Sequence, residues 1–372
     1  MESAEPPFPA YRRTLAALKR YLDLARRDDG EPLPAPAKTV EPGDAYAGVP
    51  RLTRLLTLLG DLPESSEAAN ENIYQGLVVD AVKHFQQRHG LEADGRIGKD
   101  TLRELNTPLG HRVLQLKLSL ERWRWLPREF ARPPVVVNIP EFRLRADNDE
   151  YQWILSMKIV VGKAYGHHQT PVFASEIKGV IFHPYWDVPI EIGRKELLPD
   201  VDKDRFYLSK HAYQVVDKNK RVVLDEGPLG EEIEAEIRSG QLAIRQKPGS
   251  QNALGPIKFD MPNPYDVYLH GTPAMRLFAK SRRDFSHGCI RVEDPVALAT
   301  WVLREEPGWT LDRIQAAVED PATLRAALRH PIPVWVLYST VAVMEDNEVR
   351  FFKDIYERDA ELANALARDR AD

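Results

Sequence analysis

The chain has 372 residues and carries 51 Lys and Arg against 56 Asp and Glu, for a net charge of -5. This length corresponds to two or three domains and provides enough chain for a substantial hydrophobic core. The acidic balance argues against a general nucleic-acid-binding protein, which needs a basic surplus or a basic stripe.

The single cysteine, Cys289, limits the covalent and metal chemistry available to the chain. One thiol cannot form an intramolecular disulfide, and it excludes zinc and iron–sulfur sites built from several cysteines. A lone cysteine is more often an inert buried residue than a reactive thiol, so its neighbours must decide between the two.

No run of 18 apolar residues is present, so we expect no membrane-spanning helix. Residues 1–7 lack the basic and apolar regions of a signal peptide. The sequence leaves two alternatives, a cytosolic protein or one whose signal peptide has been removed.

Apolar residues at helical spacing predict a helix over residues 9–27. The Pro-, Gly- and Asp-rich residues 28–50 predict a linker or an extended connection, which completes an N-terminal region over 1–48. Three further helices near 52–59, 77–86 and 97–105 predict a small bundle over 49–108. A connecting helix follows within 109–132.

The string AVKHFQQRHGLEADGRIGKDTLRELN, residues 81–106, resembles the peptidoglycan-binding-like three-helix module. The resemblance rests on AVxxFQ, then HGL, then DGxIGxxT. The alternative is a generic helical bundle.

The second half is β-rich, because runs of β-branched and aromatic residues alternate with turn residues. The expected strands are 135–139, 153–161, 180–182, the hairpin 213–225, 267–269 and the long run 333–344. The expected helices are 295–304, 311–318, 323–328 and 354–367. We therefore predict an α+β chain with a β-rich domain over 133–345 and a C-terminal helix within 346–372.

Residues 286–291, with the sequence SHGCIR, surround the lone cysteine with groups that favour a reactive thiol. A thiol acts as a nucleophile only as thiolate, so it needs a base or a cation nearby. His287 and Arg291 each lie two residues from Cys289. Gly288 allows backbone N–H groups to approach a reacting carbonyl.

A second histidine, His270, follows the expected strand 267–269 and is the better candidate for the base. His287 lies two residues from Cys289 in a segment that contains Gly288, and we do not expect its side chain to face the thiol. A histidine on a different strand approaches the thiol from the side. We assign His270 as general base and acid, and His287 as a residue that shapes the site.

These residues resemble the L,D-transpeptidase (YkuD-type) catalytic domain, in which a histidine on one strand precedes an [ST]HGC motif. The strings YWDVP (185–189) and RQKPGSQNALGPIKFDMPNPYDVYLHGTP (245–273) extend the resemblance to the large Gram-negative subfamily. It covers roughly residues 50–360. It implies a β-rich catalytic domain with a capping insertion over 191–249, behind the helical module.

The resemblance also implies a reaction on peptidoglycan stem peptides. Cys289 would attack the bond between the third residue and D-Ala of a donor tetrapeptide, and His270 would protonate the leaving amine. An acceptor amine would then form a 3→3 crosslink. The carbonyl of Gly271 would orient His270, and backbone amides near His287, Gly288 and Cys289 would hold the oxyanion.

Other positions are candidates for substrate binding. Arg291 is expected to hold a carboxylate, and Ser286 lies beside the nucleophile. Tyr268 and Trp186 are expected to line the pocket, with core packing as the alternative. The insertion is expected to act as a lid, supported by Arg245 and Asn252.

No cofactor or metal is expected, since His167, His168 and His183 lack a completing ligand set and form a surface group instead. Arg282 and Arg283 are expected to be solvated charges close enough to the site to meet acidic peptides.

Three functions remain open: transpeptidation, hydrolysis by a carboxypeptidase, endopeptidase or amidase, and wall binding without catalysis. The partners implied are stem peptides, with other wall-synthesis enzymes as a further class, in a periplasmic location whose leader or anchor lies outside this sequence. A carbapenem is expected to acylate Cys289. The oligomeric state is not predicted.

Overall fold

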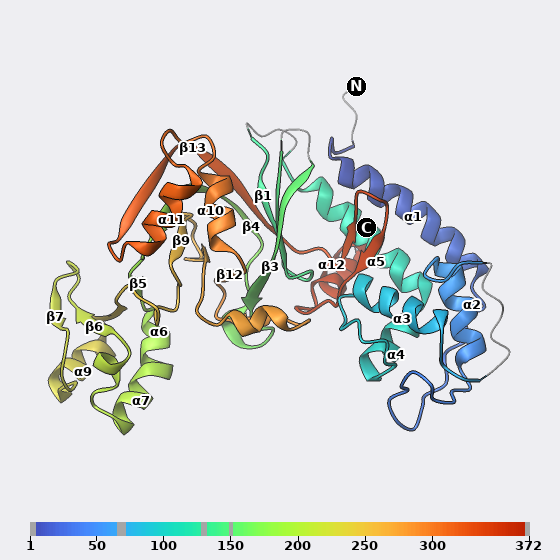
Figure 1. The fold of residues 1–372 in the computed structure, drawn as a ribbon, viewed down its shortest axis with the longest axis horizontal. Coiled ribbons are helices and arrows are strands. Elements are labelled where there is room, and N and C mark those ends of the chain that lie inside the picture. The colour runs from blue at the N-terminus through green and yellow to red at the C-terminus, as the bar shows by residue number, and fades with distance from the viewer. Residues whose placement is uncertain (1–4, 65–71, 128–131, 149–151, 369–372) are drawn as a thin grey trace. The chain divides into compact units, whose positions relative to one another are not determined.

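The computed structural model describes residues 5–64, 72–127, 132–148 and 152–368, so the first residues of the chain lie outside the described part. The chain divides into two compact units, traced in Figure 1. The helical unit contains residues 1–131, 138–142 and 337–372, and the barrel unit contains residues 132–137 and 143–336.

The helical unit is built from amphipathic helices and one hairpin. The helices are α1 (Pro9–Arg27), α2 (Val49–Leu59), α3 (Leu77–Arg88), α4 (Lys99–Leu105), α5 (Leu109–Arg124) and α12 (Arg358–Arg368), and the hairpin strands are β14 (Val341–Val343) and β15 (Val349–Phe351). Leu56, Val82, Leu116 and Phe351 are among the fully buried residues of the core that these elements share. Residues far apart in the sequence therefore form one apolar core.

The segment between α1 and α2 is an extended connection and not a free linker. Leu33, Val40 and Tyr46 are buried in the core of the helical unit. Val40 also forms an antiparallel bridge with Ile97, which explains why α4 begins at Lys99 and not at residue 97 as expected.

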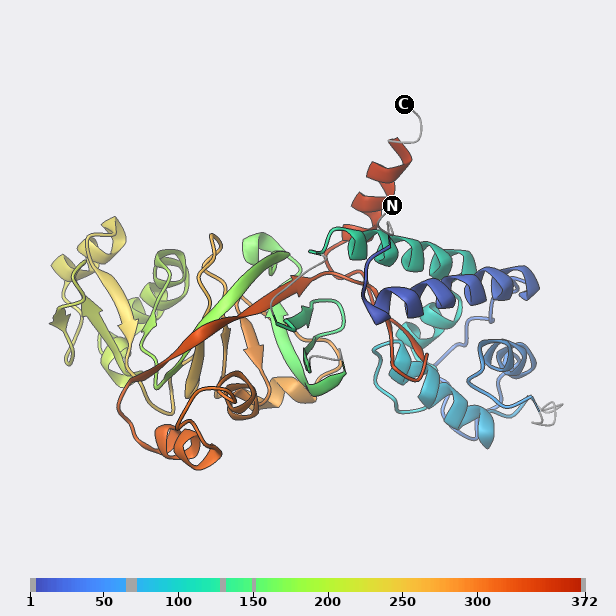
Figure 2. The ribbon, with the colours of Figure 1, turned by 90° about the horizontal axis from the view of Figure 1, so that it is seen from above.

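The barrel unit is organised by a sheet that closes on itself. Its strands are β1 (Val135–Asn138), β2 (Arg143–Asp147), β3 (Trp153–Gly162), β4 (Phe173–Phe182), β9 (Ile257–Asp260), β10 (Leu269–His270), β11 (Asp284–Ser286), β12 (Ile290–Val292) and β13 (Leu324–Leu337). The order is β11-β3-β12-β10-β9-β4-β13-β1-β2, and β2 also pairs with β3, which closes the ring. In Figure 2 β13 is the long orange-red strand, and it pairs antiparallel with β4.

Alternation along the strands separates the barrel interior from the functional face. Leu269, Ile290 and Phe259 are fully buried, and each is next in sequence to a polar residue that faces the opposite way. Two short helices, η1 (Gly166–His168) and η3 (Met275–Ala279), and the helices α10 (Pro295–Val302) and α11 (Leu311–Glu319) complete the unit, with α10 packed against β9.

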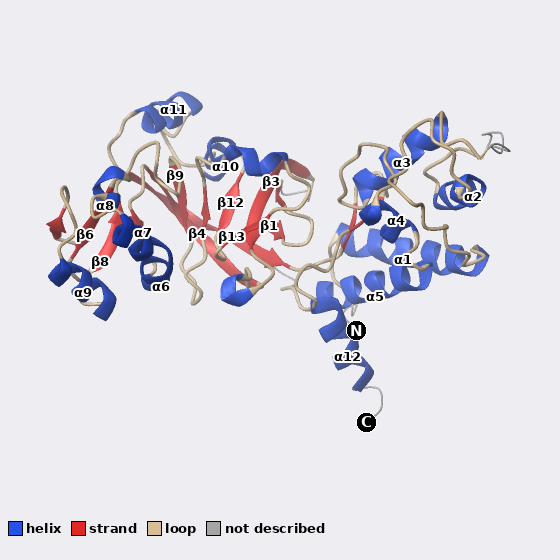
Figure 3. Cartoon of the chain, turned by 90° about the horizontal axis from the view of Figure 1, so that it is seen from below, coloured by secondary structure: helices blue, strands red, loops and turns tan. Residues whose placement is uncertain are grey.

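An insertion between β4 and β9 forms a small layer with its own core. It contains β5 (Trp186–Asp187), α6 (Ile190–Ile192), the π-helical turn η2 (Gly193–Leu197), α7 (Leu198–Lys203), α8 (Tyr207–Lys210), β6 (Tyr213–Val216), β7 (Val222–Leu224), α9 (Glu231–Ser239) and β8 (Ala243–Gln246). Its sheet has the order β5-β8-β6-β7, and Figure 3 shows helices beside these strands. Leu198, Val201 and Val215 are fully buried in this core.

The α+β prediction is confirmed, while two expected elements are wrong. Residues 323–328, expected as a helix, belong largely to β13, because pairing with β4 outweighs their helical pattern. The long run 333–344 is split into β13 and β14 by Ser339 and Thr340. The side chains of these two residues hydrogen-bond within the helical unit and interrupt the strand.

Among the residues that the structure describes, no helix combines the length and apolar character needed to cross a membrane.

The separate core of the insertion leads to a stability prediction. Val215→Asp places a charge in that core, and we expect a cost of about 3–5 kcal/mol confined to the insertion. Hydrogen exchange should show lost protection over residues 186–246, with the barrel strands still protected. Val222→Asp, at an exposed position of β7, is the matched control. Loss of protection in the barrel as well would contradict an independently packed insertion.

Candidate active site

Three neighbouring strands bring the candidate residues onto one face of the barrel. β10 pairs in parallel with β12, so that His270 lies opposite Arg291. It also pairs antiparallel with β9, so that His270 lies opposite Lys258. Cys289 immediately precedes β12, where the amide of Ile290 donates to the carbonyl of Tyr268 at 3.0 Å. Side chains two apart on a strand share a face, so Cys289 and Arg291 lie on the same side as Tyr268 and His270.

His270 is held as a neutral base. Its Nδ1 donates to the carbonyl of Gly271 at 2.5 Å, which leaves Nε2 as the acceptor nitrogen of the neutral ring. The side chain is 4% exposed. Burial lowers the pKa of His270 to about 3, and the positive charges of Arg291 and Lys258 act in the same direction. The ring is therefore uncharged at neutral pH.

The loop before Cys289 is fixed by two hydroxyl groups. Ser286 Oγ donates to the carbonyl of Cys289 at 2.6 Å and accepts from the amide of Gly288 at 3.1 Å. Thr170 Oγ1 donates to the carbonyl of Gly288 at 2.8 Å. Ser286 and Thr170 are both buried. Ser286 is thus engaged within the loop, and Thr170 is a positioning residue that the sequence analysis missed.

The amide of Gly288, expected to face the substrate, is already used by Ser286. Within the described part of the chain, the amides of His287 and Cys289 donate no hydrogen bond and are available to a ligand. Gly288 has φ +120°, a conformation that residues with a side chain rarely adopt. Its role is therefore to shape the loop.

The Cys289 thiol is partly exposed and lies 3.7 Å from the carbonyl oxygen of Asp266. Burial raises the pKa of Cys289. Hydrogen bonds from Tyr268 and the charges of Lys258 and Arg291 act against this rise. The resting site therefore holds a neutral thiol and a neutral imidazole.

The ring of Tyr268 contacts both His270 and Lys258 on this face. Its ring lies 5.6 Å from that of His270, edge-on, and the Lys258 Nζ lies 3.8 Å from its centroid. Burial raises the pKa of Tyr268 far above its usual range, so the phenol is protonated. Lys258 was not singled out from the sequence. The only available signal was a lysine on the exposed face of an alternating strand.

The insertion reaches this site through two side chains. His287 Nε2 contacts Glu196 Oε1 of the π-helical turn at 2.5 Å, and its ring stacks edge-on against His168 at 4.7 Å. Trp186 packs against the insertion core and forms a side-chain hydrogen bond with Tyr268. His287 is thus tied to the insertion.

The two residues expected to support the insertion have different surroundings. Asn252 is buried and donates to the carbonyls of Pro184 and Lys247, both at 3.0 Å. The Arg245 guanidinium lies 4.3 Å from the ring centroid of Tyr185.

Arg283 is not a solvated charge, contrary to expectation. It is buried, and it donates to the carbonyls of Ile159, Lys280 and Ser281. Arg282 pairs with Asp284 at 2.6 Å. Both arginine side chains are therefore engaged in contacts within the fold.

His167, His168 and His183, for which no metal was expected, have separate surroundings. His183 Nε2 contacts the carbonyl of Val318 at 2.8 Å. Across the described residues, no group of three or more His, Cys, Asp or Glu side chains is arranged to hold a metal ion.

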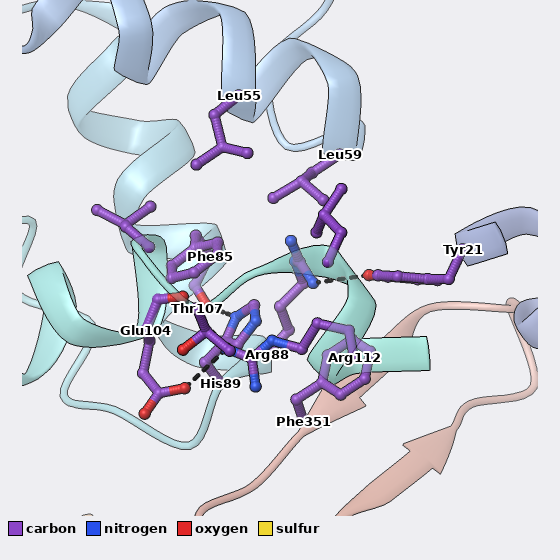
Figure 4. A pocket seen from close by; sticks show the side chains of 12 residues that line it. Tyr21, Leu55, Leu59, Phe85, Arg88, His89, Glu104, Thr107, Arg112 and Phe351 are labelled. Carbon is purple, nitrogen blue, oxygen red and sulfur yellow. Dashed lines mark hydrogen bonds and ion pairs between the residues drawn. The ribbon is translucent and has the colours of Figure 1, made fainter. Parts of the chain in front are cut away.

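A small pocket in the helical unit is lined by buried charged groups (Figure 4). Arg88 pairs with Asp61 at 2.5 Å, and Arg112 pairs with Glu104 at 2.8 Å. His89 stacks on Phe85 at 3.8 Å. Burial lowers the pKa of His89 well below its ordinary value, so the ring is neutral. These pairs hold the helices together and leave no free charge facing the pocket.

The neutral states of Cys289 and His270 lead to a prediction for alkylation of the thiol. The thiol has a raised pKa and its neighbour does not titrate near neutrality, so only the thiolate fraction varies with pH. The rate with iodoacetamide should rise about tenfold per pH unit from about pH 6 to 8. A peptide of residues 286–292 is the control. As the pH is raised, its alkylation rate should level off at a lower pH than the rate of the protein, because the pKa of its thiol is not raised by burial. A protein rate that is flat over this interval would indicate an imidazolium–thiolate pair instead.

The geometry agrees with the family matches of the chain. Residues 132–310 match the family described as "L,D-transpeptidase catalytic domain" (YkuD), and residues 46–105 match "Putative peptidoglycan binding domain".

A protein of Haemophilus influenzae named "Putative L,D-transpeptidase" is 33% identical over 248 residues, which cover 67% of this chain and 48% of that protein. The chain thus spans about half the length of this curated relative. A crystal structure of an L,D-transpeptidase from Xylanimonas cellulosilytica covers 82% of this chain and 100% of that one, at 15% identity and a TM-score of 0.25. Residues 132–310 of this chain thus match the L,D-transpeptidase (YkuD) family, and a match to the peptidoglycan-binding domain family precedes them.

Proposed function

We propose that this chain is a cysteine-dependent L,D-transpeptidase that forms 3→3 crosslinks between peptidoglycan stem peptides. The observation that carries the proposal is the neutral His270, oriented by the Gly271 carbonyl on the strand that pairs with the one following Cys289. A nucleophile beside an oriented base is the arrangement that acyl transfer requires.

In the first half-reaction the thiol proton passes to Nε2 of His270 as Sγ attacks the carbonyl carbon of the third residue. The carbonyl oxygen becomes an oxyanion, and the free amides of His287 and Cys289 are its donors. The C–N bond then breaks, the amine takes the proton from His270, and D-Ala leaves. The acyl group remains on Cys289 as a thioester.

In the second half-reaction the side-chain amine of an acceptor stem attacks the thioester carbon. His270, neutral again, takes a proton from that amine. The C–S bond breaks, and the sulfur regains its proton from His270. The ring of His270 is neutral at the start of each half-reaction, so that Nε2 is free to accept a proton.

The remaining candidates have roles in substrate binding. Arg291 is proposed to bind a carboxylate on the acyl side, since its buried Nε has no hydrogen-bond partner within the described residues. Tyr268 and Trp186 line the approach to Cys289. Ser286 contributes indirectly by holding the loop.

The insertion is proposed to act as a lid, because the contact between Glu196 and His287 ties it to the loop that carries the nucleophile. The helical domain over 49–108 is proposed to bind peptidoglycan, in line with its family match. Both proposed functions act on peptidoglycan, which supports a location in the cell envelope, and we propose the periplasm of a Gram-negative cell.

Incubation with a disaccharide-tetrapeptide tests the reaction directly. We expect a crosslinked dimer with release of D-Ala by mass spectrometry, together with a carbapenem adduct on Cys289. Cys289→Ala should abolish both, and His270→Gln should lower turnover by about 100-fold or more. Tripeptide without dimer would favour the hydrolytic alternative. An unaffected Cys289→Ala variant would contradict the mechanism.

A substitution in the loop tests the oxyanion site. Gly288→Ala forces a side chain into φ +120° and shifts the adjacent amides, so we expect acylation to fall about 100-fold. Gly227→Ala is the matched control, because Gly227 has φ +99° and its added Cβ meets nothing within 4 Å, while an added Cβ at Gly288 makes only ordinary van der Waals contacts at 3.8 Å or more. Equal loss of acylation in the two variants would show that general destabilisation is responsible.

A further inference from the structure

A row of charged and neutral side chains crosses three strands of the active face. At one level of the sheet, Arg291 on β12, His270 on β10 and Lys258 on β9 are register partners. Adjacent strands lie about 4.8 Å apart, so the two cations flank the imidazole at similar spacing. Cys289 belongs to the β12 side of this row.

Lys258 has no carboxylate partner that would account for its position, and the Cys289 thiol, which also acts on it, is neutral at rest. Among the described residues, no carboxylate lies within ion-pair distance of its Nζ, which instead sits over the Tyr268 ring. Asp187 and Asp260 attract it at longer range, but they are paired with Lys220 at 2.8 Å and Arg325 at 2.6 Å. Asp266 is the third carboxylate that acts on it.

An unpaired, partly buried ammonium is costly unless a ligand neutralises it. Burial lowers the pKa of Lys258, and placing a second cation beside a histidine that must accept a proton adds to the cost. The fold does not require a charge here, because the interior side of β9 is filled by Ile257 and Phe259. These features indicate a site for an anion.

The direction of the reaction identifies the anion. The acyl carbon of the donor must reach Cys289 on the β12 side, and the leaving nitrogen must reach His270 on β10. The leaving residue then continues toward β9, and its carboxylate is separated from the leaving nitrogen by one carbon atom. That distance brings the carboxylate to Lys258.

We propose that Lys258 binds the terminal carboxylate of the residue expelled from the acyl donor. The inference rests on the proposed function and deepens it, since it restricts the donor to peptides in which a single residue with a free carboxylate follows the scissile bond. Arg291 is left to the acyl side of the donor.

The test combines Lys258 variants with two donors, the tetrapeptide and the same peptide with its terminal alanine amidated. Lys258→Met should lower kcat/KM for the tetrapeptide about 10- to 100-fold, mainly through KM. Amidation should cost the wild type a similar factor and should cost the variant almost nothing more. Lys258→Arg should recover most of the activity. Lys178→Met, at an exposed position of β4, is the control and should match the wild type.

Equal losses for Lys258→Met on both donors would overturn the proposal, because Lys258 would then act on Cys289 or His270 and not on the carboxylate. Unchanged kinetics of the wild type on the amidated donor would overturn it without any variant. A wild type that is acylated by neither donor would instead contradict the proposed function.

Discussion

The parallel pairing of β10 with β12 is the constraint on which the site depends. It places Leu269 and Ile290 in the barrel interior and turns Tyr268, His270, Cys289 and Arg291 to the opposite face. A slip of one residue in either strand would send the histidine into the core, because side chains alternate along a strand. The closed ring fixes this register, since β2 pairs with both β1 and β3, and since β10 and β12 each have a paired strand on both sides.

The same face combines groups that are neutral with groups that are charged. His270 and Cys289 are uncharged at rest, whereas Lys258 and Arg291 are cations on either side of them. In the proposed mechanism, charge that develops on the sulfur and on the oxyanion is therefore met by positive charge already in place, without rearrangement of solvent. The loop amides depend on Ser286 and Thr170, and through His287 the loop is also joined to the insertion.

Short sequence motifs and apolar periodicity predict the features of the molecule that depend on neighbouring residues in the chain. The SHGCIR motif and His270 predict the proposed pair of nucleophile and base, and apolar periodicity predicts α1, α3 and α4 to within two residues at each end. Lys258, Thr170 and Glu196 were missed, because their roles arise from strands and turns far from Cys289 in the sequence. The error at residues 323–328 has the same origin, since only pairing with β4 makes them a strand. The engaged amide of Gly288 could not be predicted either, because it depends on the rotamer of Ser286.

The central claim is that a neutral His270, with its proton on Nδ1, serves as base for Cys289. Nitrogen-15 NMR of the histidine rings measures both the tautomer and the charge of this residue. The account predicts that His270 carries its proton on Nδ1 and does not titrate between pH 4 and 8, since its pKa is about 3. A titration midpoint near the ordinary histidine value, or a proton on Nε2 at neutral pH, would contradict it.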